Sequence, residues 1–95
     1  MSLPKTLTIA GHVVTIKYKK GLMLENHECW GIYDSDKSII WLRLGMDKTR
    51  KQEILLHEIL HAISDIHLLN LSEKQVKILG IEVLAAIKNN RLKFN

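Results

Sequence analysis

The sequence predicts a single α+β domain over its 95 residues, with a small antiparallel sheet of three to four strands followed by two packed helices. Two observations carry this prediction. Between Leu7 and Leu44 apolar and polar residues alternate with a period near two, which is typical of half-buried strands. From Gly45 onward apolar residues recur every three to four positions, as in helices that bury one face. We expect the sheet at about residues 5–44, the first helix at about 47–67 and the second at about 72–89.

Two hairpins are expected within the sheet region. Residues 5–19 form the first, because two alternating segments flank a tight turn at residues 10–12. The second joins residues 30–33 to residues 38–42 through a polar turn of hairpin length. Residues 22–29 are ambiguous, and we expect a loop or a short irregular strand there.

Both helices carry signals at their N-termini. Asp47 or Thr49 can cap the first helix, and Thr49 with Gln52 resembles a capping box. Ser72 is the expected cap of the second helix. Gly80 lies near the middle of that helix, where a missing side chain lets another backbone approach. The buried stripe of the second helix is expected to consist of Val76, Leu79, Val83, Leu84 and Ile87.

The most informative motif is His57-Glu58-Ile59-Leu60-His61, an H-E-x-x-H pattern in the apolar segment 54–66. Histidines four apart lie on one helix face, about 6 Å between Cβ atoms, so both imidazoles can bind one metal ion. Glu58 is placed to accept a proton from a water at the open side of that ion. The alternative is two surface histidines on an amphipathic helix, but the segment is apolar on most sides. The motif therefore predicts a zinc site with a general base.

A catalytic zinc ion needs a third protein ligand, and three residues are candidates. Glu73 lies in the first turn of the second helix, which an antiparallel return would bring close to His61. His67 has the spacing of the H-E-x-x-H-x-x-G-x-x-H signature of metzincins, but Ser64 replaces the glycine at which that chain leaves the helix. Asp65 continues the ridge of His61 and can bind the metal or orient a ligand histidine.

Composition and charge limit the function classes. The sequence is 46% hydrophobic and 25% charged, and no apolar run reaches the roughly 18 residues of a membrane span. With no signal-peptide pattern and one cysteine, Cys29, the chain suits a reducing cytoplasm. The net charge of +4 comes with no recognisable nucleic-acid motif, so we interpret the basic residues as a solubilising surface and do not expect a nucleic-acid partner.

Three segments together resemble small phage and prophage proteins related to the ImmA/IrrE-type zinc metallopeptidases. They are Leu55–Ile63 with the H-E-x-x-H motif, Leu71–Val76, and Val83–Asn90. The resemblance spans most of the chain and implies a minimal zincin-like fold in the cytoplasm of a bacterial host. It also implies that His57, His61 and Glu73 bind Zn²⁺ and that Glu58 is the base.

Together these observations predict a zinc-dependent metallopeptidase in which Glu58 deprotonates a metal-activated water that attacks a peptide carbonyl. His27, Tyr33 and Arg43 are candidates for a second oxyanion donor, and no spacing selects among them. The expected partner is a peptide or protein substrate, such as a regulator protein, and no membrane. The main alternative is a non-catalytic zinc-binding phage regulatory or interaction module. A weaker one is a basic nucleic-acid-associated protein in which the metal only joins two helices.

Overall fold

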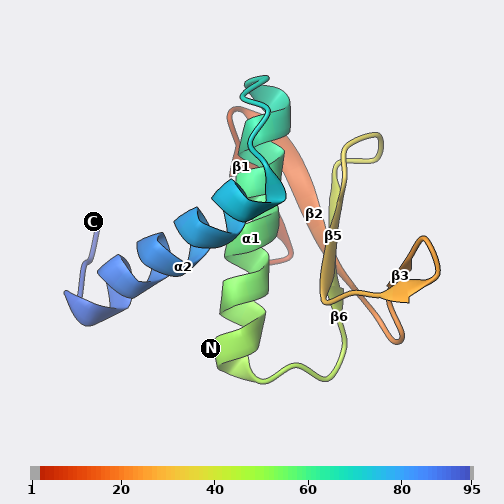
Figure 1. Cartoon of the computed structure of the whole chain (residues 1–95), viewed down its shortest axis with the longest axis horizontal. Coiled ribbons are helices and arrows are strands. Elements are labelled where there is room, and N and C mark those ends of the chain that lie inside the picture. The colour runs from red at the N-terminus through yellow and green to blue at the C-terminus, as the bar shows by residue number, and fades with distance from the viewer. Residues whose placement is uncertain (1–2, 95) are drawn as a thin grey trace.

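The computed structural model describes residues 3–94 and confirms the α+β class, with a four-stranded mixed sheet, a separate two-stranded sheet and two helices (Figure 1). The strands are β1 (Thr6–Ile9), β2 (His12–Lys19), β3 (Met23–Leu24), β4 (His27–Glu28), β5 (Gly31–Asp34) and β6 (Ile39–Arg43). The helices are α1 (Lys48–Ile66) and α2 (Glu73–Asn89). Both expected hairpins are present, and the expected helix ranges hold to within one residue at each end.

The larger sheet has the order β1-β2-β6-β5 and is not wholly antiparallel, so the predicted pairing was wrong at one place. The strands within each hairpin are antiparallel, but β2 and β6 run parallel, with Thr15 opposite Ile39. The parallel pairing arises because β6, and not β5, of the second hairpin lies next to β2, and β5 and β6 run in opposite directions. The more apolar strand of this hairpin, β6, has Ile40 and Leu42 fully buried and takes the central position. The polar-ended β5 is left at the edge, where an antiparallel strand is common.

Two tight turns contain residues with positive φ, and in each a glycine or an asparagine takes the second position. Ala10 and Gly11, with φ of 48° and 80°, connect β1 to β2 as a two-residue hairpin turn. Glu25 and Asn26, with φ of 51° and 66°, do the same between β3 and β4. The ambiguous segment 22–29 is thus a very short hairpin beyond one end of the main sheet (Figure 1).

The core lies between one face of the sheet and α1. Its fully or nearly buried apolar residues are Ile9, Val14, Ile16, Ile40, Leu42, Met46, Leu55 and Ala62. Gly31 and Tyr33 of β5 pair with Leu42 and Ile40 in an antiparallel register, so they point to this same face. The edge strand β5 therefore runs directly alongside α1.

Among the described residues α2 packs mainly against α1, through its N-terminal half. Val76 is fully buried, whereas Leu79, Val83 and Ile87 are exposed, so the predicted buried stripe was wrong for these three residues. The reason is visible in Figure 1: α2 crosses α1 and its C-terminal end projects away from the sheet. Beyond Gly80, α2 has no second layer to cover it.

The helix caps were partly predicted. The Asp47 carboxylate accepts a hydrogen bond from the Arg50 backbone N–H at 2.8 Å, so Asp47 rather than the Thr49 capping box begins α1. Ser72 caps α2 as expected, in a complete capping box with Gln75. Within residues 3–94 neither helix is long and apolar enough to span a bilayer.

Candidate metal centre

Three side chains from the two helices converge where α2 begins beside α1. His57 Nε2 lies 2.6 Å from Glu73 Oε1, and His61 Nε2 lies 2.9 Å from Glu73 Oε2. The two Nε2 atoms are 3.2 Å apart. Of the three residues proposed as third ligand, the structure brings Glu73 to the histidines, and these three form a group that can hold a metal ion.

The spacing of the donor atoms fits a small divalent cation. Ligands at about 2.0–2.1 Å from a tetrahedral zinc ion are about 3.3 Å from one another. The 3.2 Å between the two Nε2 atoms is close to this value. The 2.6 and 2.9 Å from Glu73 to the histidines are shorter, as expected when the carboxylate accepts hydrogen bonds from the imidazoles. Two imidazole nitrogens and a carboxylate are also a typical donor set of a catalytic zinc site, which keeps one coordination position for water. The three residues therefore fit a divalent metal ion.

The turn between the helices determines where Glu73 lies. Ser64, buried in α1, accepts a hydrogen bond through its Oγ from the Leu71 backbone N–H at 2.9 Å. Leu68 and Asn70 adopt positive φ of 56° and 54°, which reverses the chain direction. Ser72 then caps α2, so Glu73 is its first residue. Ser64, at the position of glycine in the metzincin signature, anchors this reversal.

Glu58 is buried next to the ligands, with 7% of its surface exposed. A Cβ atom on Gly31 of β5 would lie 2.6 Å from Ile54 Cγ2 and 3.1 Å from Glu58 Cγ, so only glycine permits this approach. Burial and then the charge of Glu73 raise the pKa of Glu58 to about 7, while a hydrogen bond from the Tyr33 backbone opposes the rise. The edge strand thus holds the proposed base against α1.

The other candidate residues lie outside the three-residue group. His67 is the exposed C-cap of α1. Asp65 accepts a hydrogen bond from Tyr33 Oη at 3.3 Å, and burial followed by the Asp65 charge raises the pKa of that tyrosine. Arg43 pairs with Glu28 at 3.1 Å, and His27 is exposed in β4. Of the three oxyanion candidates, Tyr33 alone lines the cleft described next.

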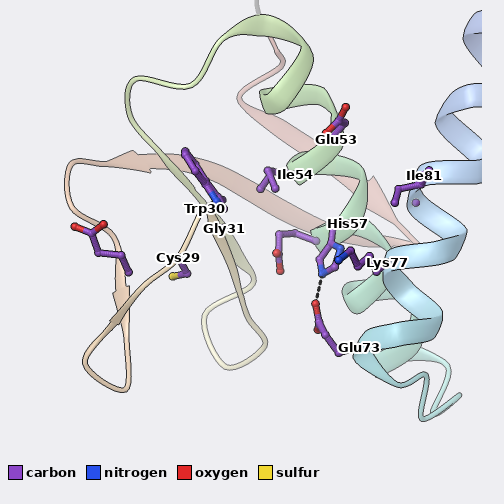
Figure 2. Close-up of a pocket in the computed structure, with 12 residues that line it drawn as sticks. Cys29, Trp30, Gly31, Glu53, Ile54, His57, Glu73, Lys77 and Ile81 are labelled. Atoms are coloured by element: carbon purple, nitrogen blue, oxygen red, sulfur yellow. Dashed lines mark ion pairs between the residues drawn. The ribbon is translucent and has the colours of Figure 1, made fainter.

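A cleft with two arms runs along both sides of His57, His61 and Glu73, which we call the metal group. Five residues line both arms: Cys29, Gly31, His57, Glu58 and Glu73. The arm that we call the apolar arm has a volume of about 450 Å³ and lies between the segment before β5 and α2 (Figure 2). Its further lining residues are Glu28, Trp30, Glu53, Ile54, Lys77, Gly80 and Ile81. The mixed arm, of about 670 Å³, has polar residues Tyr33, Ser35, Ser64, Asp65 and Asn70 among its lining.

The roles of Gly31, Trp30 and Ile81 were not predicted from the sequence. For Gly31 a signal was present, because a glycine inside a strand pattern often marks a close backbone approach. For Trp30 and Ile81 the sequence carried no such signal, because they reach the cleft from segments about fifty residues apart.

No protein-family model, curated protein or solved structure matches this chain.

Proposed function

We propose that this protein is a zinc-dependent peptidase in which His57, His61 and Glu73 hold the ion and Glu58 is the general base. The observation that carries the proposal is the convergence of the three donor groups beside a buried carboxylate, in a cleft that stays open on both sides. The resemblance of the sequence to ImmA/IrrE-type metallopeptidases supports the same assignment.

The roles follow from the surroundings of each side chain. A zinc ion at this group supplies a Lewis acid that polarises a carbonyl and acidifies water. Glu58 accepts the proton of the attacking water and passes it to the leaving amine, which its position beside His57 allows. Gly31 and the Tyr33 backbone keep the Glu58 carboxylate in place. The edge strand β5 borders the cleft and offers backbone groups that can align an extended peptide.

The test has two steps. Elemental analysis of tag-free protein, dialysed against metal-free buffer at neutral pH, is expected to give about one zinc per chain for wild type and for Glu58→Gln. A peptide library analysed by mass spectrometry is then expected to be cleaved by wild type, with at least about a 100-fold lower rate for Glu58→Gln. Absence of bound zinc, or full activity of Glu58→Gln, would contradict the proposal.

One observation favours a second candidate, a non-catalytic zinc-binding interaction module. α2 exposes several large apolar side chains along its length, including Ile78, Leu79, Val83 and Ile87. Such a surface is typical of a helix that binds a partner protein. A protein that binds zinc, but cleaves nothing in the library at any pH between about 6 and 9, would favour this module over the peptidase.

A further inference from the structure

The two arms of the cleft meet at the proposed base but differ in chemistry. The residues they share include His57, Glu58 and Glu73, so both arms begin at the metal group. The lining of the mixed arm includes the Tyr33–Asp65 hydrogen bond, a hydroxyl and an amide. The apolar arm instead presents Trp30 and Ile54 on one side and Ile81 on the other (Figure 2). A ligand that spans the metal group therefore meets two different environments.

The walls of the apolar arm leave large apolar side chains in water. Trp30 is 43% exposed and Ile81 is 56% exposed, and they line the same cavity from opposite elements. Covering both with an apolar ligand group removes apolar surface from water on both sides of that group, which favours binding. An apolar cavity next to a few fixed polar groups is typical of a ligand pocket.

The wall formed by Trp30 is held in place before any ligand binds. The guanidinium carbons of Arg43 and Arg50 lie 5.0 Å and 4.9 Å from the centre of its ring. Arg43 is itself fixed by its ion pair with Glu28. These contacts keep the indole from swinging freely, so little side-chain freedom is lost on binding.

The charges along the apolar arm select against an acidic group. Four glutamates line it, Glu28, Glu53, Glu58 and Glu73, against a single cation, Lys77. A carboxylate entering this arm would lose hydration beside Trp30, Ile54 and Ile81, and among the lining residues only Lys77 could pair with it. An apolar group meets neither cost.

We propose that the apolar arm is the pocket for one large apolar side chain of the substrate, such as leucine, methionine or phenylalanine, directly beside the bond that is cleaved. The inference rests on the proposed function, because it places this pocket next to the zinc ligands. It adds the substrate class: peptides with a large apolar residue at that position.

Hydroxamates test the pocket without requiring hydrolysis. Two small sets are used, with the variable side chain on the N-terminal or on the C-terminal side of the zinc-binding group, and with leucine, glycine or aspartate at that position. Binding to zinc-loaded protein is measured by calorimetry. In one of the two sets the leucine compound is expected to bind at least about 10-fold more tightly than the glycine compound, and the aspartate compound most weakly.

Two isoleucines of α2 provide a matched pair of variants. Ile81 lines the apolar arm at 56% exposure, whereas Ile78 is 51% exposed and lines neither arm. Ile81→Ser is expected to reduce the leucine advantage to less than about threefold. Ile78→Ser makes the same change on the same helix and is expected to leave the advantage intact. Zinc content, measured in parallel, shows that both variants keep the metal group.

The location of the ligand is checked through Cys29, which lines both arms at their junction. Saturating leucine hydroxamate is expected to slow alkylation of this thiol several-fold in wild type. Any one of four results would overturn the inference: no hydroxamate binding, no leucine preference in either set, an equal loss of that preference in Ile78→Ser, or no protection of Cys29. Its failure is distinct from that of the proposed function: selective binding without hydrolysis contradicts the peptidase alone, and hydrolysis without an apolar preference contradicts the pocket alone.

Discussion

The two helices contribute to the metal centre from very different environments. α1 lies between the sheet and α2, and its Glu58 is 7% exposed against the edge strand. α2 packs mainly on α1, and the side chain of its Glu73 is 71% exposed. The core therefore fixes the proposed base and two of the proposed ligands, whereas the position of the third, Glu73, depends on how a peripheral helix docks. We expect an ion to stabilise the docking of α2 more than the rest of the fold, because it joins Glu73 to two residues of α1.

The largest expected effect comes from removing the ligand on the peripheral helix. Glu73→Ala is expected to weaken zinc binding at least about 100-fold, about 3 kcal/mol, since one of three protein ligands is lost. His67→Ala, at the exposed end of α1, is the control and is expected to leave the affinity within about twofold. Competition with a chromophoric chelator measures both. The reverse ranking would mean that α2 does not supply the third ligand.

Two glycines compare the packing of the two helices directly. A Cβ atom on Gly31 would lie 2.6 Å from Ile54 Cγ2, so Gly31→Ala is expected to lower the free energy of unfolding by about 2–3 kcal/mol. On Gly80 of α2 the nearest atom, Leu60 Cδ1, would be 3.7 Å away, an ordinary contact. Gly80→Ala is therefore expected to raise the free energy of unfolding by about 0.5–1 kcal/mol. Urea unfolding of the metal-free proteins measures both, and a destabilising Gly80→Ala would mean that α2 packs more tightly on α1 than these distances indicate.

The buried Glu58 is expected to destabilise the metal-free protein above neutral pH. Its pKa rises from 4.5 to about 7 on folding, which corresponds to about 3 kcal/mol. The folded protein keeps a proton that the unfolded chain releases, so the stability contributed by this group falls as pH rises from 4.5 to about 7. Below that window the carboxyl is protonated in both states and contributes nothing.

Glu58→Gln isolates this effect. At pH 8 the variant is expected to be more stable than wild type by about 2 kcal/mol, somewhat less than the full penalty because a buried amide also needs partners. At pH 4 the carboxyl is protonated in both states, so only the cost of the buried amide remains, and the variant is expected to be less stable than wild type by about 1 kcal/mol. Chemical unfolding of the two metal-free proteins at both pH values gives the difference, in which contributions common to both proteins cancel. A constant difference across pH would contradict the burial of an ionisable Glu58.

The smallest expected effect lies in the turn that joins the two helices. Ser64→Ala removes the acceptor of the Leu71 backbone N–H and is expected to lower the unfolding free energy by about 1 kcal/mol. Because this bond positions the start of α2, zinc affinity is expected to fall by about threefold to tenfold. Ser38→Ala, in the turn before β6, is the control for loss of a serine and is expected to leave zinc affinity unchanged. An unchanged affinity in Ser64→Ala would mean that Ser72 alone positions Glu73.

Much of the site was predictable because it is local in the chain. The spacing of His57 and His61 specifies one helix face, and Glu58 follows from the same motif. Ser72 followed by Glu73 predicts the start of α2, and the structure places that start beside His61. The resemblance implied Glu73 as the third ligand while local spacing left His67 and Asp65 open. The structure brings Glu73 to the histidines because the chain reverses sharply after α1.

The sequence by itself determined the α+β class, the two hairpins and the ends of both helices. Alternation, turn residues and caps act over a few neighbouring residues and leave a readable pattern. Only the tertiary structure decided that β2 and β6 run parallel, that β5 lies at the edge with Gly31 against Glu58, and that half of α2 stays uncovered. These features depend on which surfaces of distant segments bury each other best, and no local pattern encodes that competition.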